Sequence, residues 1–282
     1  MAIASKLQLT ADGTAYELKD AYAREALAHF PANSYVHNAL PRGKNIQTYF
    51  DNGKLYENIA NGSFDDLFIG DYFKATYNGV SKTFRLAGFN TLYNNGDTAF
   101  NKNHAVIVPD ESLVDSYMNA SNITTGGYLG SYMHKTRIGA VASAGGTGSV
   151  NANLYSIFGT HLLTTRELLT NSVNTNGASA AGAGYTGTSN NWEWASCQAV
   201  LMSEVELYGA NVFSSSGFDT GNANMQLPLF RLMPQMKNPG RYWFWLRNVA
   251  NSTGFCNCGG NGYSSSNSAS NVSGVRPRFV IG

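Results

Sequence analysis

The sequence contains little charge. Aspartate, glutamate, lysine and arginine make up 13% of its 282 residues, about half the share that is usual in globular proteins. The 19 basic and 18 acidic residues leave a formal net charge of +1. Nucleic-acid-binding proteins carry a basic surface, so this balance predicts no nucleic-acid partner.

Long apolar runs are also missing. No window reaches 18 consecutive apolar residues, which is the length that a membrane-spanning helix needs, so we expect no membrane insertion. The start of the chain, Met1 to Lys6, lacks the apolar core of a secretory signal. We therefore expect synthesis in a cytoplasm, with any later location reached through assembly.

Cysteine is scarce, and no spacing predicts a metal site. Cys197, Cys256 and Cys258 are too few for a disulfide framework, and a bridge between two cysteines that share a strand face is strained. A structural zinc site takes four ligands, and no histidine lies near Cys256 and Cys258. We expect neither metal nor cofactor, and interpret these two thiols as small, polarizable members of a contact surface.

Candidate catalytic groups are dispersed, so we expect the protein not to be an enzyme. Asp65 and Asp66 would point in opposite directions in a strand, and Glu204 and Glu206 have apolar neighbours, whereas a glycosidase places two carboxyl groups across a cleft. The histidines, which show no ligand spacing, are His29, His37, His104, His134 and His161.

The first 45 residues predict a small module. Residues 6–10 and 15–18 flank Asp12-Gly13, a strong hairpin signal. Residues 21–28 have high helix propensity, and Pro31 ends that helix. Residues 32–44 are interpreted as a linker. We predict an attachment or oligomerisation module over residues 1–45.

Residues 46–282 predict one α+β domain with antiparallel sheets, one or two helices and long loops. Residues 67–77 and 81–89 flank the hairpin turn Asn78-Gly79, and residues 104–108 form a further strand. The best helix candidate is 128–143. Loops are predicted over 174–191 and 213–225, and the types of the elements at 161–170 and 199–208 stay open.

The segment 248–274 has no charged residue and uses only nine residue types, with seven Ser, six Asn and five Gly. An aromatic stretch precedes it, in which Trp243, Trp245 and Leu246 are predicted to pack in the core. Phe244, between the tryptophans, is predicted to face the opposite side. Arg247 and Arg276 are predicted to be buried donors to loop carbonyls, since arginine offers five N–H groups.

This C-terminal pattern resembles the variable proteins of diversity-generating retroelements, most closely the group carried by gut phages and prophages. The resemblance rests on Trp245-Leu246-Arg247, Phe255, Gly262, Ala269 and Gly274-Val275-Arg276-Pro277-Arg278-Phe279. Weaker similarities lie upstream, such as Phe68-Ile69-Gly70-Asp71-Tyr72. With them the resemblance covers roughly residues 50–282. It implies a C-type-lectin-like fold of the formylglycine-generating-enzyme type. Residues 13–24 are similar to N-terminal modules of phage tail or fibre proteins.

In that family a reverse transcriptase alters adenines in Asn codons, and all nine residue types of 248–274 are reachable in this way. The resemblance therefore implies a hypervariable binding face at about 244–274. The related enzymes use an active-site cysteine pair, but Cys256 and Cys258 are too close together for that arrangement. The candidate ligand-binding residues are Phe244, Ala250, Asn251, Thr253, Asn257, Cys258, Gly260, Asn261, Tyr263, Ser265, Asn267, Asn271 and Ser273.

The implied function is host adhesion by a phage tail, with the protein synthesised in a bacterial cytoplasm and located in the virion. Its partners would be a bacterial surface protein or glycan and other tail proteins of the virion. The family contains both trimers and monomers, so a homotrimer stays open. Two alternatives also stay open: a structural or decoration protein of the virion, and a polysaccharide-degrading tail protein.

Overall fold

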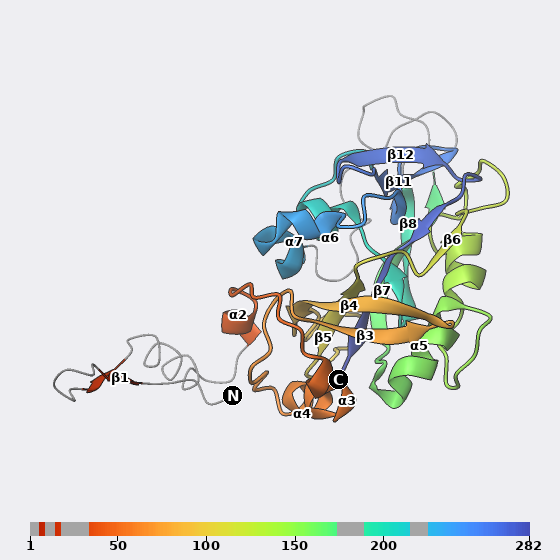
Figure 1. The fold of residues 1–282 in the computed structure, drawn as a ribbon. Helices are drawn as coiled ribbons and strands as arrows, with labels where there is room; N and C mark the ends of the chain where they lie inside the picture. Colours follow the sequence, from red (N-terminus) through yellow and green to blue (C-terminus); the bar gives the residue numbers. More distant parts are fainter. Residues whose placement is uncertain (1–5, 9–14, 18–33, 174–188, 215–224) are drawn as a thin grey trace.

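The computed structural model describes residues 6–8, 15–17, 34–173, 189–214 and 225–282. Within them the fold is mixed α+β (Figure 1), as predicted, and all strand pairs except one are antiparallel. The predicted helix at 21–28 and most of the predicted loops at 174–191 and 213–225 lie outside the described residues.

Two hairpins form where the sequence predicts them. Strand β1 (Lys6–Gln8) pairs antiparallel with β2 (Ala15–Glu17). Strand β3 (Tyr72–Tyr77) pairs with β4 (Val80–Phe89) through a turn in which Asn78 and Gly79 have φ of 48° and 79°. Positive φ at both turn residues is what a type I′ hairpin requires.

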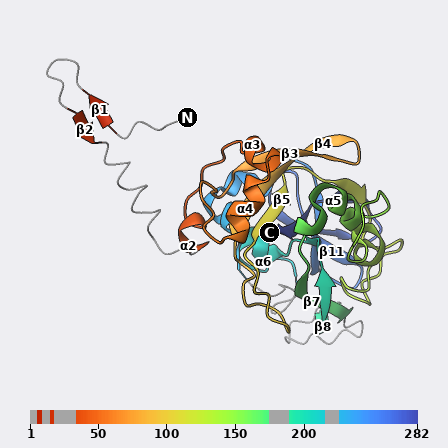
Figure 2. The ribbon, with the colours of Figure 1, turned by 90° about the horizontal axis from the view of Figure 1, so that it is seen from below.

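The β3–β4 hairpin begins a five-stranded sheet. Its order is β3-β4-β5-β14-β9, with β5 at Ala105–Pro109, β14 at Pro277–Ile281 and β9 at Val200–Leu201. Helix α5 (Val150–Phe158) covers one face, where Phe158 packs edge-on against Phe84 with ring centroids 5.6 Å apart. Helices α3 (Gln47–Asp51) and α4 (Lys54–Ala60) precede β3 in the chain, and α3 lies beside β3 in both views (Figure 1, Figure 2).

A second five-stranded sheet contains the segment that the sequence singles out. Its order is β12-β11-β10-β13-β6, with β6 at Val114–Ser116, β10 at Phe244–Val249, β11 at Gly254–Cys258, β12 at Ser264–Ser268 and β13 at Ser273–Val275. A separate antiparallel pair joins β7 (Thr165–Val173) to β8 (Ser189–Cys197). The element left open at 161–170 is therefore the strand β7. The element left open at 199–208 consists of the strand β9 and the helix α6 (Glu204–Tyr208).

The long helix predicted at 128–143 is wrong. Only Met133–Ile138 is helical, as a single π-helical stretch. Gly130 cannot carry a side chain, because a Cβ there would lie 2.5 Å from the carbonyl oxygen of Gly126, and Gly139 ends the helix at φ 83°. The positive φ of Gly139 therefore ends the helix at Ile138, five residues before the predicted end.

Residues 34–45 do not form a free linker. Helix α2 (Ser34–His37) begins this stretch, and the Asn38 side chain exchanges two hydrogen bonds with the backbone of Phe89. Further along, Arg42 pairs with the buried Asp71 at 2.5 Å. The end of the predicted N-terminal module therefore packs on the larger domain.

Short helices α7 (Pro228–Leu232) and Pro234–Lys237 connect α6 to the last strands.

At the junction of the sheets lies a buried network of two arginines and two glutamates. Arg278 on β14 pairs with Glu167 on β7 at 2.8 Å and with Glu206 on α6 at 2.5 Å, and Arg247 on β10 pairs with Glu206 at 2.5 Å. Burial alone would raise the pKa of Glu206, but the charges of Arg247 and Arg278 outweigh it and the pKa is lowered. These ion pairs tie together both sheets, the β7–β8 pair and α6.

Candidate functional site

The uncharged segment 248–274 contributes the edge of the second sheet. Strand β11 pairs with β10 on one side and with β12 on the other, and Gly254 to Cys258 face Ser268 to Ser264 in register. Figure 1 places β11 and β12 at the top of the molecule, above the β3–β4 hairpin. The edge strand and the connections at its two ends are thus the parts of this segment nearest the surface.

The structure divides the thirteen predicted site residues by burial. Asn251, Thr253, Asn261, Tyr263 and Asn271 are exposed, and Ala250, Gly260, Ser265 and Asn267 are half-buried. The other four, Phe244, Asn257, Cys258 and Ser273, are buried.

For those four, the expectation of a surface position is wrong, because the second sheet is covered on both faces. Phe244 packs against the Arg276 guanidinium, 5.1 Å from its ring centroid. Cys258 is a free thiol whose pKa is raised by burial. Asn257 lies in the fully buried strand β11, and Ser273 begins β13 between its two neighbouring strands.

The flanking tryptophans behave differently from one another. Trp245 and Leu246 are buried as predicted, and the Trp245 indole donates to the Ser116 carbonyl at 2.8 Å. Trp243 is 44% exposed, so its predicted place in the core is wrong. It precedes β10, whose first residue is Phe244, and so lies outside the covered part of the sheet.

The predicted roles of the two arginines are confirmed in large part. Arg276 donates to the carbonyls of Pro109, Lys237 and Met236. Arg247 donates to one carbonyl, that of Leu201, and also to the Glu206 carboxylate. Both arginines hold the framework and are not available to a ligand.

One end of the segment is aromatic. Tyr263 is 49% exposed, and its ring meets that of Trp243 edge-to-face, with centroids 5.6 Å apart at 86°. The Arg241 guanidinium donates to the Asn261 side chain at 2.9 Å. We call Arg241, Trp243, Gly260, Asn261 and Tyr263 the aromatic end.

Two backbone features shape this end. The Gly259 N–H donates a hydrogen bond of 2.9 Å to the Tyr263 carbonyl, and this bond closes the turn between the two residues. A Cβ on Gly259 would come within 2.5 Å of the Tyr263 ring, so the ring lies directly over this glycine. Arg241 adopts φ of 53°, a left-handed conformation that is costly for a residue other than glycine.

The other end of the segment is rich in side-chain amides. The Asn251 carboxamide oxygen accepts from the Thr253 amide and hydroxyl, and Asn271 donates to Asn267 at 2.6 Å. We call Asn122, Asn251, Thr253, Asn267, Ser270 and Asn271 the amide end.

Part of the amide end comes from a distant segment that sequence reasoning missed. The Asn122 carboxamide oxygen accepts from the Ser270 backbone and hydroxyl, and the Thr124 hydroxyl donates to the Asn251 carbonyl at 2.8 Å. Nothing in the sequence around residue 122 marks this contact, because the partners lie 127 and 148 residues away.

A buried carboxylate fixes the edge strand. Glu204 accepts from the backbone N–H groups of Val212, Phe213 and Ser214, and from the Ser264 hydroxyl at 2.5 Å. Burial alone would raise the pKa of Glu204, but these hydrogen bonds outweigh it and the pKa is lowered. The Ser264 hydroxyl is therefore held by Glu204, whereas the neighbouring Ser265, on the other face of β12, has no side-chain hydrogen bond to any residue that the structure describes.

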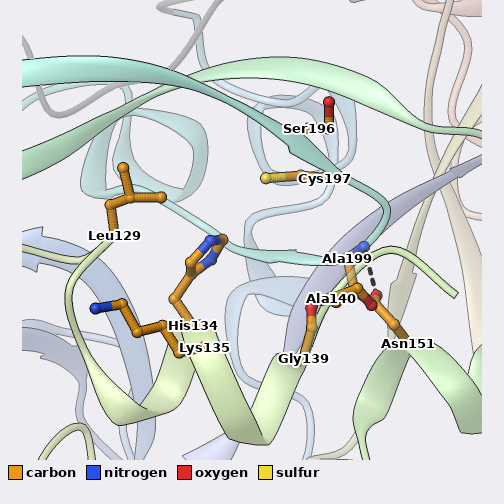
Figure 3. A pocket seen from close by; sticks show the side chains of 9 residues that line it. All are labelled: Leu129, His134, Lys135, Gly139, Ala140, Asn151, Ser196, Cys197 and Ala199. Atoms are coloured by element: carbon orange, nitrogen blue, oxygen red, sulfur yellow. Dashed lines mark hydrogen bonds between the residues drawn. The ribbon is translucent and has the colours of Figure 1, made fainter.

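A cavity of about 300 Å³ lies away from this segment, between the π-helix and the end of β8 (Figure 3). Burial lowers the pKa of His134 to about 4 and raises the pKa of Cys197 to about 12. Both groups are therefore neutral near pH 7. The lining residues are Leu129, His134, Lys135, Gly139, Ala140, Asn151, Ser196, Cys197 and Ala199.

The Cys197 thiol of this lining is not an activated nucleophile. A thiol reacts as its thiolate, and Cys197 remains protonated. The Asn151 amide is occupied in joining Gly139 and Ala199, through a donated and an accepted hydrogen bond.

Across the described ranges, His, Cys, Asp and Glu side chains do not gather in groups of three or more that could hold a metal ion. Among the helices within those ranges, none has the length and apolarity needed to cross a bilayer.

The chain matches no protein-family model, no curated protein and no solved structure.

Proposed function

We propose that this protein is a receptor-binding protein of a phage or prophage tail. It would bind a ligand on the bacterial surface through the aromatic end, the amide end and the edge strand between them, on a C-type-lectin-like domain diversified by a retroelement. The observation that carries the proposal is the division within segment 248–274. Its buried residues lie in strands β10, β11 and β13 and at Gly259 and Ala269. Its exposed residues, all uncharged, lie in the connections between the strands, at Asn251, Thr253, Asn261, Tyr263, Asn271 and Val272.

The framework beneath these ends does not depend on the exposed residues. The ion pairs that join Arg247, Arg278, Glu167 and Glu206 involve no residue from Asn248 to Gly274. Trp245 and Arg276 are likewise anchored to residues outside that range. Substitutions at exposed positions can therefore change the surface at little cost to folding.

The chemistry of the exposed residues suits recognition. Tyrosine supplies contact area at a low cost in conformational entropy, and serine, glycine and asparagine supply adaptable hydrogen bonds, as in antibody paratopes. Single-site affinity would be modest, because a standard interface takes roughly 20 to 30 residues a side. A tail that displays many copies would gain roughly two to four orders of magnitude through avidity.

The test is binding of the purified full chain to host cells. Tyr263→Ala, Asn251→Ala and Asn261→Ala should each weaken binding while the melting temperature is retained. Tyr93→Ala is the matched control, because Tyr93 is 42% exposed and lies outside the segment. If all three variants bind as the wild type does, the proposal fails and a structural or decoration role is favoured. Release of oligosaccharide from host capsule would instead favour a polysaccharide-degrading protein.

A further inference from the structure

The aromatic end contains two side chains that precede the proposed variable segment 244–274. Trp243 is 44% exposed, and Arg241 is exposed at the same end. If the proposed function holds, these two residues are a constant part of a surface whose remainder varies. A constant part would suit a chemical feature that different ligands share.

The Arg241 guanidinium is available to an anion. Within the described part of the chain it forms no ion pair, and one hydrogen bond, from Nη2 to Asn261, is its side-chain contact. Most of its five N–H donors remain free, and a guanidinium binds a carboxylate through two parallel hydrogen bonds. The left-handed backbone at Arg241, φ 53°, holds this side chain at the 259–263 turn despite its conformational cost.

The tryptophan and the turn supply what a sugar ring requires. Trp243 and Tyr263 stand at 86° to each other, so their rings support each other, and 44% of Trp243 remains open to solvent. An exposed indole packs against the apolar C–H face of a pyranose. The Trp243 indole lies at the 259–263 turn, where a Cβ on Gly260 would come within 3.8 Å of its nitrogen, and the next residue of this turn, Asn261, offers its amide to hydroxyl groups. One open ring, one amide and one guanidinium match a single sugar unit better than a protein patch, which takes about 800 Å² per partner.

We infer that the aromatic end is a subsite for an acidic sugar residue of a bacterial surface glycan, with Trp243 stacking on the ring and Arg241 pairing with its carboxylate. This inference rests on the proposed function and names the ligand class of part of that surface.

The probes are tetrasaccharides that contain glucuronate or galacturonate, each compared with its carboxyl-reduced form. Binding to the full chain is followed by calorimetry and tryptophan fluorescence. The wild type should bind at least one acidic tetrasaccharide about tenfold or more tightly than its reduced form, since hydrogen bonds between charged groups are the strong ones. Arg241→Gln should remove that preference and leave binding of the reduced form unchanged. Trp243→Ala should weaken binding of both forms.

Matched controls separate a site effect from a general one. Arg231→Gln removes another exposed arginine, on α7, and Tyr93→Ala another exposed aromatic ring. Neither should change tetrasaccharide binding. Because Arg241→Gln keeps a Cβ at the left-handed position, its folding should match the wild type.

Four results would overturn the inference: equal affinity for the acidic and reduced forms of every probe, no effect of Trp243→Ala, competition by poly-glutamate but by no sugar, or a change of oligomeric state in Trp243→Ala on ultracentrifugation. Host-cell binding distinguishes this failure from failure of the proposed function. Cell binding that survives Trp243→Ala but not Tyr263→Ala or Asn251→Ala removes the acidic-sugar subsite alone.

Discussion

Replacing Glu206 with glutamine tests the framework most severely. The buried network contains Arg247 and Arg278 against Glu206 and Glu167, and its charges balance. Glu206→Gln leaves one buried positive charge without a partner, and breaking a buried pair in this way costs about 3–5 kcal/mol. For a chain of this size, 1 kcal/mol changes the melting temperature by about 2–4 °C. The expected decrease at pH 7 is therefore about 6–20 °C.

Differential scanning calorimetry measures this decrease, and Glu111→Gln is the control. Glu111 pairs with Lys82 at the surface, with 56% of its side chain exposed, and surface pairs contribute little. The double variant Glu206→Gln, Arg247→Met should recover part of the loss, since it removes the unpaired charge. A decrease below about 2 °C for Glu206→Gln would refute this account of the network.

The pH dependence of the same network follows from its pKa shift. The pKa of Glu206 is lowered in the folded state, so its contribution is present above the ordinary glutamate value of about 4.3 and is lost as pH falls through the folded pKa. The stability difference between the wild type and Glu206→Gln should therefore shrink in acid. A difference that grows below pH 4 would contradict the assigned direction.

Three further predictions concern the candidate surface and the cavity. Gly259→Ala places a methyl group within 2.5 Å of the Tyr263 ring, so the ring should move and host-cell binding should fall. The control in the same binding assay is Gly148→Ala, where a Cβ would meet nothing within 4 Å. Glu204→Gln places an amide against the N–H donors of 212–214 and the hydroxyl of Ser264, so proteolysis after residue 212 should accelerate several-fold; an unchanged rate would contradict the anchoring role. His134 should titrate near pH 4 in an NMR experiment because of its burial, and stability should rise with pH between about 4 and 6.5 as the unfolded histidine loses its proton; a pKa near 6.5 would contradict its burial.

Local signals in the sequence were sufficient for the hairpins. Asn78-Gly79 specifies a type I′ turn through the residues themselves, and Asn78 and Gly79 take the required positive φ. The arginines at 247 and 276 were predictable as buried donors because arginine offers five N–H groups and both have apolar neighbours in the sequence. These features depend on neighbours in sequence.

The failures share a different cause. The alternation argument for Trp243, Phe244 and Trp245 assumed a sheet with one buried face, but both faces of β10 are covered, so Phe244 and Trp245 are both buried. The same covering buries Asn257 and Cys258, which a composition of small polar residues does not reveal. A two-sided sheet cannot be recognised until the elements that cover it are placed.

Contacts between residues that lie far apart in the sequence could also not be predicted. Glu206 meets Arg247 across 41 residues and Arg278 across 72, and Asn122 meets Ser270 across 148. The capping-box pattern of Ser203 and Glu206 was a readable helix signal, but the second role of Glu206 in the ion-pair network depends on the tertiary fold. The exposure of Trp243, on which the acidic-sugar subsite rests, became visible only with the start of β10 fixed.

Hydrogen–deuterium exchange of the full chain, with and without host envelope, tests the central claim most directly. The account predicts that envelope slows exchange at residues 259–263 and 250–253, with Glu206, Arg247 and the rest of the buried framework unchanged. Protection confined to other surfaces, such as residues 34–45, or no protection anywhere in 241–274, would contradict the assignment of this end of the molecule as the binding surface.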